Sequence, residues 1–244
     1  MLFSRSGRII EEERIRGMEP HTEGEKVRGF IDGEYQDGEI RGCMFIAGKR
    51  GTGKTTEMGR MLSGCGGGAL FFDPLARHES VLPGYRVFSQ PGEVSDYLRL
   101  NSQRRFRVLY QPRSGLVTQH FQAACLIARA FGRMVFAIDE LDMMCGSQWG
   151  DTRMPTELYA LVNYGRHNQV AMLATARYPQ SVPRGFTSQC GEMRLFAMTE
   201  PKHLKYFEEY IGVETAERVS RLEKYQFLRW QDGQEQIPLC GGRR

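Results

Sequence analysis

The sequence has no hydrophobic run that is long enough to cross a membrane. The longest uninterrupted run, residues 65–72, has eight residues and includes three glycines, whereas a membrane-spanning helix needs about 20. The opening residues, MLFSRSGRIIEEER, have no apolar core of signal-peptide length and soon become acidic. We therefore expect a protein that is neither secreted nor membrane-spanning.

Paired metal ligands are also lacking. The six cysteines are spread along the chain, no two of them stand at C-x-x-C spacing, and the five histidines do not complete a cluster. A structural zinc site needs ligands that are grouped in pairs. We therefore expect reduced cysteines that pack as small apolar residues.

The net charge is small but unevenly distributed. Among 244 residues, 33 lysines and arginines against 29 aspartates and glutamates leave a charge of +4. Residues 1–40 hold six basic and ten acidic side chains, so they carry −4 and residues 41–244 carry +8. We predict a polar, acidic N-terminal arm over 1–40 and a single domain over 41–244, whose basic excess favours an anionic partner.

Short apolar runs alternate with helical periodicity from residue 43 onward. Runs typical of buried strands are 43–47, 69–72, 107–110, 134–138, 170–175 and 193–197. Segments with helical spacing are 57–62, 91–100, 116–131, 155–164, 200–210 and 215–224. This alternation predicts an α/β fold with a mainly parallel sheet and helices on both faces.

A phosphate-binding loop is the most specific motif. Residues 48–56, GKRGTGKTT, match the pattern G-x-x-x-x-G-K-[ST] in full, between a predicted strand and a predicted helix. Backbone N–H groups of such a loop surround the β-phosphate of a nucleotide at the positive end of the helix. Lys54 would reach the β- and γ-phosphates, the Thr55 hydroxyl would bind Mg²⁺, and Thr56 would support the α-phosphate. The predicted nucleotide-binding residues are Gly48, Lys49, Arg50, Gly51, Thr52, Gly53, Lys54, Thr55 and Thr56.

A second motif of the same site follows at 134–140, where the apolar run MVFAI ends in Asp139 and Glu140. It looks like a Walker B motif. Asp139 would hold the Mg²⁺ shell, and Glu140 would orient and deprotonate a water for attack on the γ-phosphate. Switch GTPases and small-molecule kinases usually lack a glutamate there. The two motifs together predict a RecA-like P-loop fold and ATP hydrolysis, with ATP and Mg²⁺ at the site.

Further segments resemble one superfamily of these ATPases. The strand 170–175 and the following ARYPQSVP (176–183) resemble the T-Q-R-P-x-x-V of the FtsK–HerA superfamily of DNA-pumping ATPases; YGRH (164–167) and FDP (72–74) fit the same group. The resemblance covers residues 42–230. Ala176 departs from it, because the family commonly has Gln there. Thr175 or Gln180 would then have to sense the γ-phosphate.

The short chain is similar to the genome-packaging ATPases of membrane-containing icosahedral viruses and related phages. This resemblance implies a homo-oligomeric ring, a hexamer, that moves double-stranded DNA into a capsid. It also implies an arginine donated to the neighbouring subunit, with Arg166 as the first candidate and Arg177 as the second. The expected location is the cytoplasm of a host cell or the virion, and the acidic arm is a candidate contact to capsid vertex proteins.

DNA contact is less well defined than the ATP site. Arginines gather in one segment (Arg99, Arg104, Arg105, Arg107, Arg113) and stand again at Arg177 and Arg184. They would give salt-sensitive, sequence-independent binding to a duplex, but the first segment equally fits a solvated helix–strand connection. Two alternatives stay open: a zonular-occludens-toxin-type assembly or secretion ATPase that acts on protein, and a nucleotide-dependent structural subunit with negligible hydrolysis.

Overall fold

The structure is a computed structural model that describes residues 40, 42–77, 82–101, 104–113, 116–145, 154–231 and 234–240. The arm predicted over 1–40 lies outside the described residues apart from Ile40, so the division of the chain at residue 40 stays a prediction.

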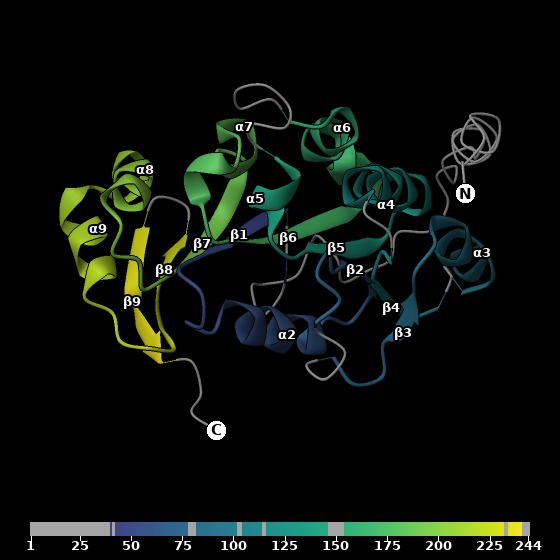
Figure 1. Cartoon of the computed structure of the whole chain (residues 1–244), viewed down its shortest axis with the longest axis horizontal. Helices are drawn as coiled ribbons and strands as arrows, with labels where there is room; N and C mark the ends of the chain where they lie inside the picture. Colours follow the sequence, from purple (N-terminus) through teal and green to yellow (C-terminus); the bar gives the residue numbers. More distant parts are fainter. Residues whose placement is uncertain are drawn as a thin grey trace.

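The described strands form one nine-stranded sheet, in the order β3-β4-β2-β5-β6-β1-β7-β8-β9 (Figure 1). Strands β1 to β7 pair in parallel, while β8 pairs antiparallel with both β7 and β9. The bounds are β1 Cys43–Ala47, β2 Gly68–Phe72, β3 Arg86–Phe88, β4 Arg107–Tyr110, β5 Met134–Ile138, β6 Val170–Ala176, β7 Cys190–Phe196, β8 Gln226–Gln231 and β9 Gln234–Cys240. The predicted mainly parallel sheet is confirmed, and β3, β8 and β9 are additional strands.

Helices cover both faces of the sheet, but unequally. In Figure 1, α2 lies on one face, and α4, α5, α6 and α7 lie on the other. The bounds are α2 Lys54–Gly64, α3 Pro91–Asn101, α4 Val117–Phe131, α5 Leu141–Met144, α6 Thr156–Tyr164, α7 Arg184–Thr187, α8 Pro201–Ile211 and α9 Val213–Ser220. The last helix begins and ends earlier than the pattern 215–224 predicts: it covers Val213–Ser220, and the chain then passes through Tyr225, which has a φ of 69°, into β8.

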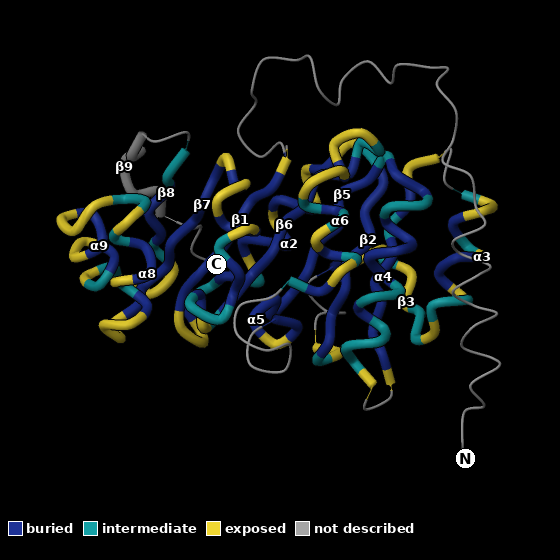
Figure 2. Tube along the Cα trace, turned by 90° about the horizontal axis from the view of Figure 1, so that it is seen from above, coloured by how far each residue is buried: buried dark blue, intermediate teal, exposed yellow. Residues whose placement is uncertain are grey.

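The two faces of the central strands build two separate cores. Along β1, Phe45 packs among residues of the larger helical layer, whereas Met44 and Ile46 pack with Met58 and Leu62 of α2. A parallel strand that is covered on both sides reads as a continuous apolar run, which is why these strands were recognisable in the sequence. Figure 2 shows the same strands as buried segments through the middle of the molecule.

Five cysteines have described side chains, and all five are buried and free: Cys43, Cys65, Cys125, Cys145 and Cys190. Burial raises the pKa of the Cys43 thiol to about 12, so it stays protonated. No group of three His, Cys, Asp or Glu side chains in the described segments could hold a metal ion. Within those segments, no helix combines the length and the apolar character that a membrane span requires.

Candidate nucleotide-binding site

The carboxyl edge of the parallel strands carries the site. The phosphate loop follows β1, while Asp73 follows β2, Asp139 follows β5 and Arg177 follows β6. These four strands are neighbours in the sheet and run parallel, so residues that follow them meet at one edge, where open α/β sheets bind ligands.

The phosphate loop needs glycine at positions of close contact. A Cβ on Gly48 would lie 2.6 Å from the Cβ of Phe196, and a Cβ on Gly53 would lie 2.9 Å from the Cδ1 of Tyr225. Gly53 also has a φ of 109°, which side chains disfavour. The Thr52 hydroxyl closes the loop by donating to the carbonyl of Lys49 at 2.8 Å.

Lys54 begins α2 and extends back over the loop. Its side chain is buried, and Nζ donates to the carbonyl of Gly48 at 2.7 Å and to that of Lys49 at 3.1 Å. Burial lowers the pKa of this ammonium, and the nearby carboxylates Glu140 and Asp139 act in the opposite direction. The buried positive charge therefore lies where a phosphate could neutralise it.

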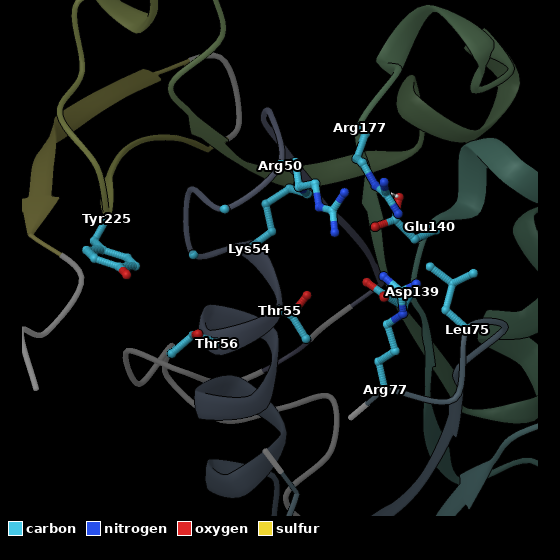
Figure 3. A pocket seen from close by; sticks show the side chains of 12 residues that line it. Arg50, Lys54, Thr55, Thr56, Leu75, Arg77, Asp139, Glu140, Arg177 and Tyr225 are labelled. Carbon is cyan, nitrogen blue, oxygen red and sulfur yellow. Dashed lines mark hydrogen bonds and ion pairs between the residues drawn. The ribbon is translucent and has the colours of Figure 1, made fainter. Parts of the chain in front are cut away.

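A cavity of about 310 Å³ opens beside the loop (Figure 3). Four cationic side chains and two carboxylates are among its lining residues, which are Arg50, Gly51, Gly53, Lys54, Thr55, Thr56, Leu75, Arg77, Asp139, Glu140, Arg177 and Tyr225. The excess of positive charge and the loop N–H groups suit a polyphosphate anion.

Thr175 of β6 holds both carboxyl residues of the Walker B motif. Its hydroxyl donates to Asp139 Oδ1 at 2.6 Å and accepts the backbone N–H of Glu140 at 3.0 Å. Thr175 is fully buried, and Glu140 has a φ of 53°, a left-handed conformation that costs a non-glycine residue about 1–3 kcal/mol. The hydroxyl predicted as a sensor thus lies in direct contact with both carboxyl residues.

Arg177 lies inside the cavity of its own chain. Its Nε donates to Glu140 Oε2 at 2.6 Å. Its backbone N–H and that of Tyr178 donate to the two carboxylate oxygens of Asp142, at 3.3 and 3.2 Å. Burial and the nearby Glu140 raise the pKa of Asp142 to about 6. Within a single chain, Arg177 therefore already contacts Glu140. Its role as an arginine donated to a neighbouring subunit stays a prediction.

Arg166 lies at the amino ends of the parallel strands, opposite the edge that carries the phosphate loop. It belongs to a short 3₁₀ helix, Gly165–Asn168, that precedes β6, and its side chain is exposed and does not line the cavity. Its role as an arginine donated to a neighbouring subunit stays a prediction. Gln180, the alternative sensor, also does not line the cavity.

Arg77 is a site residue that the sequence analysis missed. Asp73 accepts the backbone N–H of Leu75 at 3.2 Å, that of Arg77 at 2.8 Å and the side-chain amide of Gln111 at 2.9 Å. These bonds fold the segment after β2 so that the Arg77 side chain points toward Asp139 (Figure 3). The FDP motif marks this turn in the sequence, but no pattern marks the arginine.

The predicted basic segment is partly used for structure. Arg99 pairs with Asp96 at 2.8 Å, and Arg105 donates to the carbonyl of Cys65 at 3.0 Å. Arg107 donates to the carbonyls of Gly67 and Cys65 as well. The contacts of Arg105 and Arg107 fasten the start of β4 to the start of β2, while the Arg99 pair lies within α3. All three arginines thus have partners in their own chain, which favours the structural interpretation for them.

Charged side chains also form a buried cluster beside α2, which the sequence analysis missed. Arg194 of β7 contacts Glu57 of α2 and Glu192 of its own strand, the latter at 2.7 Å. Arg229 of β8 donates to Glu192 at 2.8 Å, and Arg60 donates to Glu57 at 2.8 and 3.0 Å. The cluster connects the helix after the phosphate loop to β7 and β8.

Solved structures of ATPases share this fold. The genome packaging NTPase from Sulfolobus turreted icosahedral virus 2, in complex with ATP-gammaS, aligns with a TM-score of 0.64 and 16% identity, over 84% of this chain and 100% of that one. The DNA-packaging ATPase from Sulfolobus turreted icosahedral virus aligns with a TM-score of 0.59 and 19% identity, over 78% and 91% of the two chains.

VirB4 of Thermoanaerobacter pseudethanolicus aligns with a TM-score of 0.60 and 9% identity, over 86% of this chain and 92% of that one. No family model matches the chain, and no curated protein matches its sequence. The chain has the fold of these ATPases. The resemblance inferred from the motifs is confirmed as a structural similarity at low sequence identity.

Proposed function

We propose that the protein hydrolyses ATP. One observation carries this proposal: Lys54 of the phosphate loop and the pair Asp139–Glu140 line a single cavity, although they come from distant parts of the sequence. The loop N–H groups and Lys54 bind the phosphates, and Glu140 receives the proton of the attacking water while the γ-phosphate is released.

Magnesium fits the donor set of the cavity. The Thr55 hydroxyl and the Asp139 carboxylate are the hard oxygen ligands that Mg²⁺ prefers, and Thr175 orients the carboxylate by its hydrogen bond. When bound, Mg²⁺ would neutralise charge on the β- and γ-phosphate oxygens. Arg177 and Arg77 add positive charge on the same side of the cavity as Asp139 (Figure 3).

Two variants test the hydrolysis. Lys54→Ala should abolish tight ATP binding, because it removes the buried cation of the loop. Glu140→Gln should bind ATP but release phosphate about 10²- to 10⁴-fold more slowly, since it removes the general base. Equilibrium binding and phosphate release are measured on the same preparations. Turnover at the wild-type rate in Glu140→Gln would contradict the assignment.

The finer proposal is a ring, a hexamer, that moves double-stranded DNA into a viral capsid. Its support is the fold shared with two packaging ATPases, together with the charge of +8 on residues 41–244. Duplex DNA should stimulate ATP hydrolysis by the purified chain, and added salt should weaken the stimulation. If no duplex stimulates hydrolysis, the alternative of an assembly or secretion ATPase that acts on protein is favoured.

The donated arginine can be tested by mixing subunits. If Arg166 acts on the neighbouring site, then Arg166→Ala and Lys54→Ala chains are each inactive alone. In a mixed ring, an Arg166→Ala site is completed by the arginine of a Lys54→Ala neighbour, so part of the hydrolysis returns. Mixtures that stay inactive, although both chains assemble into one ring, would contradict a role of Arg166 in the neighbouring site.

A further inference from the structure

Tyr225 occupies an unusual place against the phosphate loop. It stands directly before β8, which runs antiparallel to β7, so the start of β8 lies at the same edge of the sheet as the loop. The backbone N–H of Tyr225 donates to the carbonyl of Thr52 at 3.2 Å. The ring lies so close to Gly53 that a Cβ there would be 2.9 Å from it. Tyr225 is nevertheless 43% exposed as a residue, and it lines the cavity.

The ring and the reactive groups lie at opposite ends of the cavity. Figure 3 shows Tyr225 on one side of Lys54 and Thr56, and Asp139, Glu140 and Arg177 on the other. In the proposed binding mode, the γ-phosphate lies next to the carboxylates Asp139 and Glu140, and the α-phosphate lies next to Thr56. A nucleoside joined to that α-phosphate therefore leaves the loop at the end where Tyr225 lies.

Few groups at this end could recognise the edge of a base. Gly53, which contacts Tyr225, and Thr56 lie at this end, and they offer backbone groups and one hydroxyl (Figure 3). Among the described lining residues there is no Asn or Gln, and both carboxylates lie at the far end. The aromatic face of Tyr225 is thus the largest surface that a base can contact there.

We propose that the nucleobase stacks on the ring of Tyr225 and is bound by its face. Stacking is tolerant of base identity, because every base has a π-face, so the site accepts adenine and guanine with comparable affinity. Lys224 places its ammonium 4.8 Å from the ring centroid. Both side chains are exposed, so this cation–π contact is weak and the base displaces it.

The inference rests on the proposed nucleotide binding, and the experiment separates the two. Binding of ATP, GTP and inorganic tripolyphosphate to the full chain is measured by calorimetry in the presence of Mg²⁺. Tyr225→Ala should weaken the binding of ATP and of GTP by about tenfold to a hundredfold, the usual effect of losing a stacking partner. It should leave tripolyphosphate binding unchanged. Tyr225→Phe should keep the affinity for all three ligands.

Tyr159→Ala is the matched control, because Tyr159 is an exposed tyrosine of α6, 54% accessible, outside the cavity. ATP binding that is unaltered in Tyr225→Ala would overturn the stacking alone. A strong wild-type preference for ATP over GTP would do the same. Equal weakening of ATP and tripolyphosphate would assign Tyr225 to the shape of the loop instead. A wild-type chain that binds neither tripolyphosphate nor ATP would overturn the proposed function and the stacking with it.

Discussion

Arg194→Ala should destabilise the protein strongly, because the substitution leaves two carboxylates in the interior. Among the described residues, Arg194 is the largest fully buried side chain, 1% exposed, and it contacts both Glu57 and Glu192. Removing one partner of a buried ion pair costs about 3–5 kcal/mol. Glu57 keeps Arg60 and Glu192 keeps Arg229, so we expect the lower end, about 3 kcal/mol.

The matched control for this variant is Arg60→Ala. Arg60 pairs with the same Glu57, but its side chain is 51% exposed, so solvent screens the pair and its loss should cost no more than about 1 kcal/mol. The loss of stability in Arg194→Lys should lie between the losses in Arg60→Ala and Arg194→Ala, because one ammonium cannot reproduce a planar guanidinium that contacts two carboxylates.

Urea unfolding measures the difference. With slopes of about 1–3 kcal/mol per molar urea, a loss of 3 kcal/mol lowers the midpoint by about 1–3 M at unchanged slope. Burial alone raises the pKa of Glu57, but Arg60 and Arg194 outweigh it and hold the pKa below 4.5. The contribution of the cluster is therefore present above that pH and lost as the pH falls through the lowered pKa. If Arg194→Ala costs no more than Arg60→Ala, the cluster does not stabilise the fold as argued.

Three further variants probe the site. Thr175→Val should slow ATP hydrolysis and leave Asp139 and Glu140 without a shared hydroxyl, which costs about 1–3 kcal/mol; unchanged hydrolysis and stability would contradict its role. Arg177→Ala should lower hydrolysis by about 10³-fold or more; if Arg177 acts on Glu140 of its own chain, as its hydrogen bond suggests, mixing with Lys54→Ala chains gives no rescue, whereas rescue would assign it to the neighbouring site. Asp142 has a raised pKa of about 6, so its protonated form stabilises the fold below about pH 4 and this contribution is lost as the pH rises to about 6. Asp142→Asn should remove that dependence from urea midpoints measured across the same pH range.

The sequence was sufficient where one chemical requirement dominates. The loop 48–56 and the pair Asp139–Glu140 stand out in the sequence because phosphate binding and hydrolysis would restrict the residue types at fixed spacings, and the structure brings both to one cavity. The parallel strands were found because two-sided burial demands uninterrupted apolar residues. The bounds of β1, β4 and β5 agree with the prediction at both ends.

The strands that the sequence pattern did not predict carry polar residues at buried positions or lie at the edge of the sheet. Strand β3 has three residues, of which Arg86 and Val87 are exposed, so it has almost no apolar signal. Strand β8 includes Arg229, whose charge is matched by Glu192 on the neighbouring strand. Such pairs cannot be inferred from a local pattern, because the partners meet only after the sheet has formed.

The Thr52–Tyr225 hydrogen bond has a consequence for the order of assembly during synthesis. The phosphate loop is made early, but one wall of its cavity comes from a residue near the end of the described chain. A contact between segments so far apart in the sequence closes a long loop, and the chain loses the corresponding entropy before the contact can stabilise the fold. A nascent chain that ends before β8 therefore carries the whole loop motif without the complete cavity, and the site is finished only when the last strands have joined the sheet.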